Sequence, residues 1–205
     1  PMLAQGEVSR MARALREVGI DSIAGSLFTD VSMKDDKPYG WGWCWDDDYG
    51  PLSALTVDGK DRFADHFLEA LASAGVRLST HCAYAGQAPS NSRVLVTVTH
   101  SIDQVLHRVL KNADNIYAES LFYQIAAFGG KKNAGRKQAV QHIESLIRGL
   151  GLNPNNYQIA DGSGLSLYNY VSPELLVRLL NFAWNNEAVR QHIYWALPLA
   201  GDDGT

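Results

Sequence analysis

Amphipathic segments that stop at a glycine recur along this chain, and they limit its possible fold more than any other feature of the sequence. Four segments place apolar side chains at helical spacing and end at or just before a glycine: residues 7–19, 61–75, 114–128 and 134–149. Helical periodicity closed by a glycine is typical of a helix with a C-terminal cap. The sequence therefore predicts a helix-rich chain.

Further helices are predicted from their capping residues. Ser101 precedes an apolar helical pattern and has Gln104 three residues later, the spacing of a capping box. Ser172 is followed by Pro173, which occupies the favoured first position of a helix. A last helix is expected over residues 186–196.

Strand patterns are fewer and shorter. Residues 93–99 are rich in β-branched side chains and alternate valine with leucine or threonine, which predicts the clearest strand of the chain. A short strand is expected within residues 20–30, and a short extended piece over residues 157–160. Residues 79–92 are rich in serine, alanine and asparagine and predict a loop. The sequence itself shows no internal repeat.

The charge balance argues against nucleic acid as a partner. Lys plus Arg number 18 and Asp plus Glu 22, so the formal net charge is -4 and offers no basic footprint. With 46% hydrophobic residues the chain is expected to be a soluble globular protein. No apolar run approaches the roughly 18 to 20 residues that cross a bilayer. The N-terminus lacks the layout of a signal peptide.

Neither a metal nor a cofactor is predicted. Cys44 and Cys82 are too few for a disulfide framework or a zinc site. The six histidines show no metal-ligand spacing. A P-loop, a dinucleotide fingerprint and Gly-x-Ser-x-Gly are absent from the sequence.

An irregular, aromatic stretch lies in residues 31–60. It contains Trp41, Trp43 and Trp45, which would share one side of an extended segment, and an acidic run follows at residues 46–48. One interpretation is a core plug beneath a long loop. The other is the rim of a site for a polar, partly apolar ligand, because indole faces and carboxylates together suit one.

Gly162-Ser163-Gly164 alone indicates only a tight turn, but its context gives it more meaning. Five motifs occur in the order of a known family: Gly40-Trp-x-Trp-x-Trp-Asp-Asp47, Pro51-Leu-Ser-Ala-Leu-Thr56, Lys111-Asn-Ala-Asp-Asn-Ile-Tyr-Ala-Glu119, Asp161-Gly-Ser-Gly-Leu-Ser166 and Leu197-Pro-Leu-Ala-Gly201. Over nearly its whole length, the chain resembles the D-alanyl-D-alanine carboxypeptidase/endopeptidase family of class C penicillin-binding proteins.

The resemblance implies a serine peptidase of the cell envelope or periplasm that acts on peptidoglycan stem peptides and is inhibited by β-lactams. In that family, the serine of a Ser-x-x-Lys motif forms an acyl-enzyme, and a Lys-Thr-Gly strand and a Ser-x-Asn motif complete the cleft. This sequence contains neither Ser-x-x-Lys nor Lys-Thr-Gly. Both ends also look cut, so we expect an internal fragment that is inactive on its own.

The Ser-x-Asn motif is altered. By the resemblance, the family serine falls at Ala113, which has no hydroxyl group, while Asn115 keeps the asparagine that reaches the ligand amide. The other interpretation of this segment is a plain helix start with Asp114 as its cap.

The resemblance also implies substrate-binding residues. Leu165 would lie at the cleft, and a second set would line the pocket for the stem-peptide side chain: Trp43, Trp45, Asp46, Asp47 and Tyr49. A carboxylate there would meet the ammonium group of a diaminopimelate residue. Leu167 stands where some relatives carry an arginine, which argues against a salt bridge to the carboxylate of that side chain.

The expected fold is α/β, a partial transpeptidase-like (β-lactamase-like) domain whose helices pack on an incomplete antiparallel sheet. One domain over residues 1–205 is expected, and the large insertion of relatives after about residue 58 is absent. Missing strands would leave an exposed sheet edge and an apolar face that favour aggregation.

Three functions follow from these observations. The first is a serine D-Ala-D-Ala carboxypeptidase/endopeptidase. The second is a non-catalytic relative that binds peptidoglycan or an envelope partner, and Ala113 motivates it. The third, a β-lactamase, shares the general fold but lacks the Asp-Gly-Ser-Gly-Leu-Ser motif and ranks lowest. An intact Ser-x-x-Lys and Lys-Thr-Gly in a longer sequence would support the enzyme.

Overall fold

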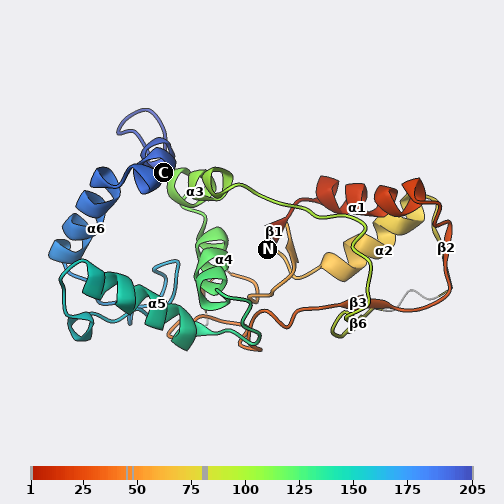
Figure 1. Cartoon of the computed structure of the whole chain (residues 1–205), viewed down its shortest axis with the longest axis horizontal. Helices are drawn as coiled ribbons and strands as arrows, with labels where there is room; N and C mark the ends of the chain where they lie inside the picture. The colour runs from red at the N-terminus through yellow and green to blue at the C-terminus, as the bar shows by residue number, and fades with distance from the viewer. Residues whose placement is uncertain (1, 45, 48, 80–82, 205) are drawn as a thin grey trace. The chain divides into compact units, whose positions relative to one another are not determined.

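A computed structural model describes residues 2–44, 46–47, 49–79 and 83–204. The chain divides into two compact units. The first unit comprises Pro1–Lys34 and Tyr49–Thr99, and the second comprises Asp35–Asp48 and His100–Thr205 (Figure 1). The prediction of one partial peptidase domain without its insertion is not tested by this division and stays a prediction.

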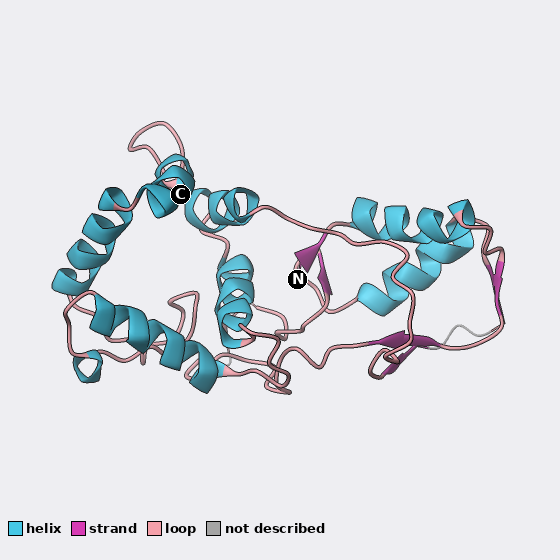
Figure 2. Ribbon diagram, in the orientation of Figure 1, coloured by secondary structure: helices cyan, strands magenta, loops and turns pink. Residues whose placement is uncertain are grey.

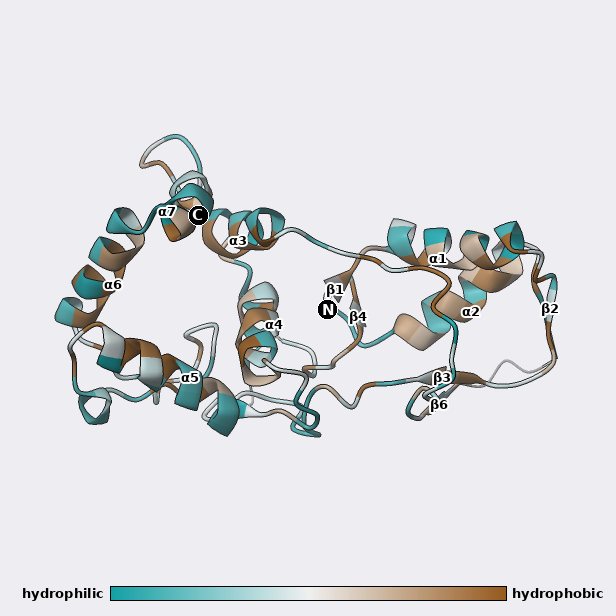
Figure 3. Cartoon of the chain, in the orientation of Figure 1, coloured by the Kyte–Doolittle hydropathy of each residue, from teal (hydrophilic) through white to brown (hydrophobic). Residues whose placement is uncertain are grey.

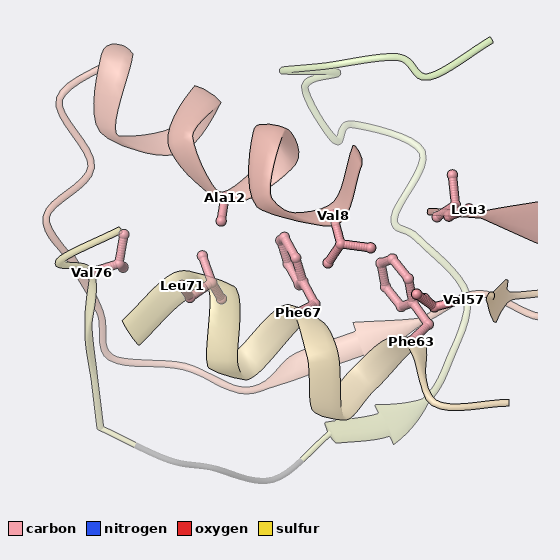
Figure 4. Close-up of a cluster of buried hydrophobic side chains, with 8 residues drawn as sticks. All are labelled: Leu3, Val8, Ala12, Val57, Phe63, Phe67, Leu71 and Val76. Atoms are coloured by element: carbon pink, nitrogen blue, oxygen red, sulfur yellow. The ribbon is translucent and has the colours of Figure 1, made fainter. Parts of the chain in front are cut away.

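The first unit is built around two helices, α1 (Gln5–Glu17) and α2 (Phe63–Ser73), which pack on each other as Figure 4 shows. Both helices were predicted. The Phe63 and Phe67 rings stack one turn apart, with centroids 5.5 Å from each other. The buried cluster consists of Leu3, Val8, Ala12, Val57, Phe63, Phe67, Leu71 and Val76.

Three short parallel strand pairs complete the described part of this unit. They are β1 (Met2–Leu3) with β4 (Thr56–Val57), β2 (Ser22–Ile23) with β5 (Arg77–Leu78), and β3 (Leu27–Thr29) with β6 (Ala83–Ala85). The predicted antiparallel sheet is therefore wrong. Each pair joins a strand from before residue 35 to one from after residue 48, and such long crossovers permit parallel pairing.

The two halves of the first unit share one order of elements, strand, helix, strand, strand. Each element pairs with its counterpart: β1 with β4, α1 with α2, β2 with β5 and β3 with β6. Structural repetition is thus present, although no internal repeat was predicted.

Two predictions for residues 79–99 are wrong. The segment 93–99 forms no strand, because no strand among the described residues pairs with it, and Val94 is 77% exposed. Val98 instead packs against the buried cluster. Conversely, the predicted loop contains β6, whose residues show no apolar alternation.

The second unit is helical in its described part (Figure 2). Its helices are α3 (Ile102–Lys111), α4 (Asn115–Ala126), α5 (Arg136–Gly149), α6 (Pro173–Asn185) and α7 (Glu187–Ile193), with single 3-10 turns η1 (Pro154–Asn156) and η2 (Tyr194–Ala196). Among the described residues, no helix is long and apolar enough to cross a membrane.

The predicted caps of this unit are confirmed. The Ser101 hydroxyl accepts from the Gln104 amide at 3.2 Å, and the Gln104 side chain accepts from the Ser101 amide at 2.9 Å. The Ser172 hydroxyl accepts from the Leu175 amide at 3.2 Å at the start of α6. The short extended piece pairs Gln158 with Tyr170 in an isolated antiparallel bridge.

Candidate functional site

The loop of residues 161–169, which we call the Asp161 loop, folds around one buried carboxylate. Oδ1 of Asp161 accepts hydrogen bonds from the Gly164 amide at 2.9 Å and from Asn169 Nδ2 at 2.6 Å. Oδ2 accepts from the Ser166 amide at 2.7 Å. Asp161 is only 5% exposed, so these donors replace the water that a carboxylate needs. The loop is fixed in shape by its own first residue.

A second buried carboxylate, Glu119 of α4, joins the same loop to the helix. Its Oε1 accepts from the Gly162 amide at 3.0 Å and from the Ser163 amide at 2.8 Å. Glu119 is 1% exposed, and burial raises its pKa above the ordinary value of 4.5. The hydrogen bonds from Ser163 oppose that rise, while the charge of Asp161 adds to it.

Close contact between α4 and the loop explains the glycine at position 162. A Cβ there would lie 2.6 Å from Phe122 Cβ and 2.9 Å from the Ala118 carbonyl oxygen. Both neighbours belong to α4 and cannot move away without shifting the helix. Gly162 and Glu119 therefore fix the distance between α4 and the Asp161 loop.

The tryptophan segment is turned rather than extended at Gly42, so the predicted common side is wrong for Trp41 and Trp43. Gly42 has a φ of +82°, and a Cβ on it would lie 2.4 Å from the Tyr168 ring. The indoles on either side of Gly42 therefore have different partners. Trp43 Nε1 donates to Asp161 Oδ2 at 2.9 Å, while the Trp41 ring lies 5.0 Å from that of Tyr168.

Of the two described indoles of this segment, Trp43 fits the interpretation as a core plug and Trp41 fits the interpretation as an exposed rim. Trp43 is half-buried and takes part in the hydrogen bonding of the Asp161 loop. Trp41 is 46% exposed, and the Arg136 guanidinium lies 4.4 Å from its ring centroid. Arg136 is itself held by its hydrogen bond to the Ile159 carbonyl at 2.9 Å.

The other predicted pocket residues are described one by one. Asp47 Oδ2 accepts from the Cys44 amide at 2.6 Å, so this carboxylate holds a turn of its own loop. Asp46 is exposed, and Tyr49 belongs to the first unit. Trp45 lies outside the described residues. The place of these residues beside a ligand stays a prediction.

The altered Ser-x-Asn motif forms the start of α4. Asp114 caps the helix by accepting from the Tyr117 amide at 3.1 Å, and Arg108 Nε donates to it at 3.1 Å. Ala113 is exposed, with a left-handed φ of +49°. Asn115 is the first residue of α4, one turn before Glu119. The helix-start interpretation is thus confirmed as structure, and a ligand role for Asn115 is compatible with it.

Leu165 and Leu167 differ in their surroundings although both follow the Gly-Ser-Gly turn. Leu165 is half-buried, and its amide lies 3.5 Å from the Ser163 hydroxyl. Leu167 is 81% exposed. Within the described ranges, no group of three His, Cys, Asp or Glu side chains is placed to hold a metal ion.

The sequence pattern of the D-Ala-D-Ala carboxypeptidase 3 (S13) family matches residues 1–61 and 50–205. The chain belongs to this family. The two matched segments together span the whole chain, and the resemblance drawn from the motifs is confirmed.

Two curated S13 relatives are similar in sequence. The chain is 27% identical over 179 residues to D-alanyl-D-alanine carboxypeptidase DacB of Haemophilus influenzae, a match covering 86% of this chain and 37% of that protein. It is 31% identical over 163 residues to D-alanyl-D-alanine carboxypeptidase of Actinomadura sp. (strain R39), covering 76% of this chain and 29% of the relative. The chain thus spans about a third of the length of these relatives.

The fold is also shared. The crystal structure of penicillin-binding protein 4 (DacB) from Haemophilus influenzae superimposes with a TM-score of 0.85 at 20% identity, covering 99% of this chain and 63% of that one. The predicted relation to the penicillin-binding-protein fold is therefore confirmed in part. The same protein complexed with a novel β-lactam superimposes with a TM-score of 0.73.

Sequence analysis missed Glu119 and Asn169 as parts of the site. Glu119 lies on the buried face of α4 together with Phe122, Tyr123 and Ala126. A carboxylate at helical spacing among apolar side chains is unusual unless it has buried partners, and this pattern was visible in the sequence. For Asn169 the only sequence evidence was its nearness to the Gly-Ser-Gly turn.

Proposed function

We propose that this chain is part of a serine-type D-Ala-D-Ala carboxypeptidase/endopeptidase that acts on peptidoglycan stem peptides. The observation that carries the proposal is the anchoring of the Asp161 loop to α4 by Glu119, together with the bracing of that loop by Asp161, in a member of the S13 family. It holds Asn115 and Leu165, both expected at the cleft, on two segments of fixed spacing. Such preorganisation is what an acyl-transfer site requires.

The reaction has two steps. A serine Oγ attacks the carbonyl carbon before the terminal D-alanine, its proton passes to the leaving amine, and D-alanine departs to leave an ester. Water then attacks the ester, which restores the serine and releases the shortened peptide. The sequence holds neither Ser-x-x-Lys nor Lys-Thr-Gly, so in this proposal the nucleophile is not one of its residues.

The chain's own residues have binding roles in this proposal. Asn115 donates its side-chain amide to a substrate carbonyl at the start of α4, and Leu165 packs against the substrate backbone. Trp43, Asp46 and Asp47 lie on the side of the stem-peptide side chain, where a carboxylate pairs with an ammonium group. Ala113 supplies no hydroxyl for proton transfer, so water takes that place.

β-Lactams are the expected inhibitors, and the periplasm or cell envelope is the expected compartment. The support for the first is the β-lactam complex of the Haemophilus influenzae relative. The support for the second is the substrate class alone, since peptidoglycan lies outside the inner membrane.

A non-catalytic peptidoglycan- or envelope-binding relative is the second candidate. Ala113 favours it, because this position lacks the hydroxyl that the family motif carries. The two candidates differ in covalent chemistry, since only the enzyme forms an ester with penicillin.

Labelling with fluorescent penicillin distinguishes them. The full-length gene product and its Ala113→Ser variant are incubated with the probe and separated on a denaturing gel. A covalent band in the unaltered protein supports the enzyme. A band only after Ala113→Ser places the defect at that position. Silence in both, with folding verified by circular dichroism, contradicts the enzyme and supports the binding protein.

A further inference from the structure

A polar groove lies where the end of α5, the later part of α6 and the start of α7 meet. Its volume is about 570 Å³, within the roughly 300 to 1,000 Å³ that is typical of small-ligand pockets. Leu150, the residue that ends α5, forms part of its wall. None of the groove residues belongs to α4 or to the Asp161 loop, so the proposed function leaves this groove without a role.

The groove lies on the hydrophilic side of α6. The polar residues of this helix recur at helical spacing and form one stripe: Glu174, Arg178, Asn181 and Asn185. The last three of them line the groove. Figure 3 shows hydrophilic bands along the helix. The polar face of a helix normally stays in contact with water, so this side of α6 is available to a soluble ligand.

Three asparagine side chains line the groove and keep hydrogen-bonding groups available. Asn185 Nδ2 donates to Asn181 Oδ1 at 2.5 Å and to the Asn181 carbonyl oxygen at 2.8 Å. These bonds hold the two side chains together but leave Asn181 Nδ2 and Asn185 Oδ1 without a partner among the described residues. Asn186 is half-buried, and its side chain caps no helix. The groove thus presents both amide donors and amide acceptors.

The charged side chains of the groove are already neutralised. Arg178 Nη2 lies 3.7 Å from Glu174 Oε1, and Glu187 pairs with Arg190. A phosphate or carboxylate would have to compete with Glu174 for the guanidinium of Arg178, and a cation would have to compete with Arg190 for Glu187. The groove therefore favours a ligand without net charge.

A sugar ring combines the properties that this lining requires. Phe182 is 39% exposed and Leu150 is half-buried, so the groove also has a small apolar surface. A pyranose carries hydroxyl groups that both donate and accept around its edge, and C–H groups on its faces that can pack against an aromatic ring. An acetamido substituent adds one N–H and one C=O, which match side-chain amides.

A peptide fits the groove less well. Extended peptides bind at a free sheet edge, helical peptides bind in an apolar groove, and proline-rich peptides bind across several aromatic rings. The described part of the second unit contains no strand, and Phe182 is the one aromatic residue of the groove as the structure describes it. The lining is also too polar for the apolar face of a helix.

We propose that this groove binds the glycan strand of peptidoglycan through an N-acetylated sugar ring. The inference rests on the proposed function for the choice of polymer, because stem peptides are attached to glycan strands. A second contact with the same polymer raises the effective concentration of stem peptides at the peptidase site. The groove thereby favours polymeric peptidoglycan over soluble stem peptides.

Binding of a sugar without any stem peptide tests the groove directly. An oligomer of N-acetylglucosamine is titrated into the full-length gene product, and its affinity is measured by isothermal calorimetry. We expect binding by the unaltered protein and at least about tenfold weaker binding by the Asn181→Ala/Asn186→Ala double variant, which loses hydrogen bonds to the ligand. Asn155→Ala is the matched control, because Asn155 is an exposed asparagine of η1 outside the groove. Circular dichroism verifies the folding of each variant.

The size of the substrate is the second measurement. Release of D-alanine is followed on intact peptidoglycan and on a soluble stem pentapeptide that carries no sugar. We expect the double variant to lower the ratio of kcat/KM on the polymer to kcat/KM on the peptide at least about fivefold. A loss of folding alone would lower both values and leave their ratio unchanged, whereas the Asn155→Ala control should keep the ratio of the unaltered protein.

Three results would overturn the proposal. The first is no binding of the sugar oligomer by the unaltered protein, and the second is equal binding by the folded double variant. The third is binding of the sugar-free pentapeptide that the same two substitutions abolish, which would make a peptide the occupant.

The proposed function is judged separately from the groove. Sugar binding that the double variant loses, in a protein that neither releases D-alanine nor is acylated by penicillin, would support the groove and refute the peptidase. Release of D-alanine by a protein that binds no sugar would do the reverse.

Discussion

Glu119 is a buried carboxyl group whose ionisation opposes folding. The unfolded chain releases this proton near the ordinary pKa of 4.5, whereas burial raises the pKa in the folded chain. Between those two pKa values the folded state binds more protons, so the free energy of unfolding falls as pH rises through that window. Tyr123 and Asp161 are the titratable neighbours that interact with this group.

Glu119→Gln should remove that part of the pH dependence. The glutamine carbonyl oxygen can still accept from the Gly162 and Ser163 amides, but it carries no charge. We therefore expect the free energy of unfolding at pH 7 to be kept or raised, and to depend less on pH above pH 4.5.

Glu119→Ala should lower the free energy of unfolding by about 1 to 3 kcal/mol, because it leaves buried amides without acceptors. Urea unfolding at several pH values measures both, and an unchanged profile in Glu119→Gln would contradict this account. Glu174→Gln, on an exposed carboxylate, is the control.

Ala113 holds a left-handed conformation that glycine adopts without strain. Ala113→Gly should raise the free energy of unfolding by about 0.5 kcal/mol, since relief of the left-handed penalty exceeds the added entropy of the unfolded chain. Ala188→Gly, on an exposed helical residue of α7, should lower it by about 1 kcal/mol. Thermal unfolding compares the two variants. Similar losses in both would mean that Ala113 is not strained.

Gly42 approaches Tyr168 too closely for a side chain. Gly42→Ala should cost about 1 to 3 kcal/mol from its positive φ and the 2.4 Å contact. Gly149→Ala should instead stabilise by about 0.5 to 1 kcal/mol, because that glycine is in α5 with nothing near its Cβ position. Chemical denaturation measures the free energy of unfolding of both variants. An unchanged value in Gly42→Ala would contradict the described turn at Gly42.

At the scale of single residues, the sequence predicted the caps better than the site. Ser101 and Ser172 are local features, so a short window of sequence identifies them. The hydrogen bond of Trp43 to Asp161 joins residues 118 positions apart, and no local pattern predicts it. The family resemblance predicted Trp43 as a pocket residue and gave Asp161 only as part of a motif, so it did not link the two.

At the scale of elements, the Ser172 cap stabilises the start of α6. Ser172→Ala should lower the free energy of unfolding by about 1 kcal/mol, because it removes the acceptor for the Leu175 amide at the start of α6. Ser145→Ala, in the middle of α5, should be neutral or slightly stabilising, because that hydroxyl only donates to the Gln141 carbonyl. Equal effects in calorimetry would refute the assigned cap.

At the scale of elements, helices were predictable and strand pairing was not. The glycine stops located α1, α2, α4 and α5 to within a few residues. Residues 93–99 have strand composition but no partner, and pairing depends on tertiary contacts that composition does not encode. A weak clue to the paired halves was present. Ala14-Leu15 precedes Gly19-Ile20, and Ala70-Leu71 precedes Gly75-Val76 at the same spacing.

At the scale of the whole molecule, the motifs predicted the family but not the division into two units. Five short motifs in the order of the family were enough to predict the family, because their order can be read along the sequence without knowing the fold. The division depends on which segments pack together, and residues 35–48 leave the first unit to join the second. The apolar excess of α6 was visible as sequence, yet its exposure became evident only in the structure.

The spacing between α4 and the Asp161 loop is the central claim, and Gly162→Ala tests it most directly. Its Cβ would lie 2.6 Å from Phe122 Cβ and must push the two segments apart. The rate of acylation by fluorescent penicillin is measured for the full-length protein, this variant and Gly149→Ala, each with folding verified. We predict acylation of the unaltered protein and of Gly149→Ala, and at least about tenfold slower acylation of Gly162→Ala. Equal rates in all three, or no acylation of the unaltered protein, would contradict the account.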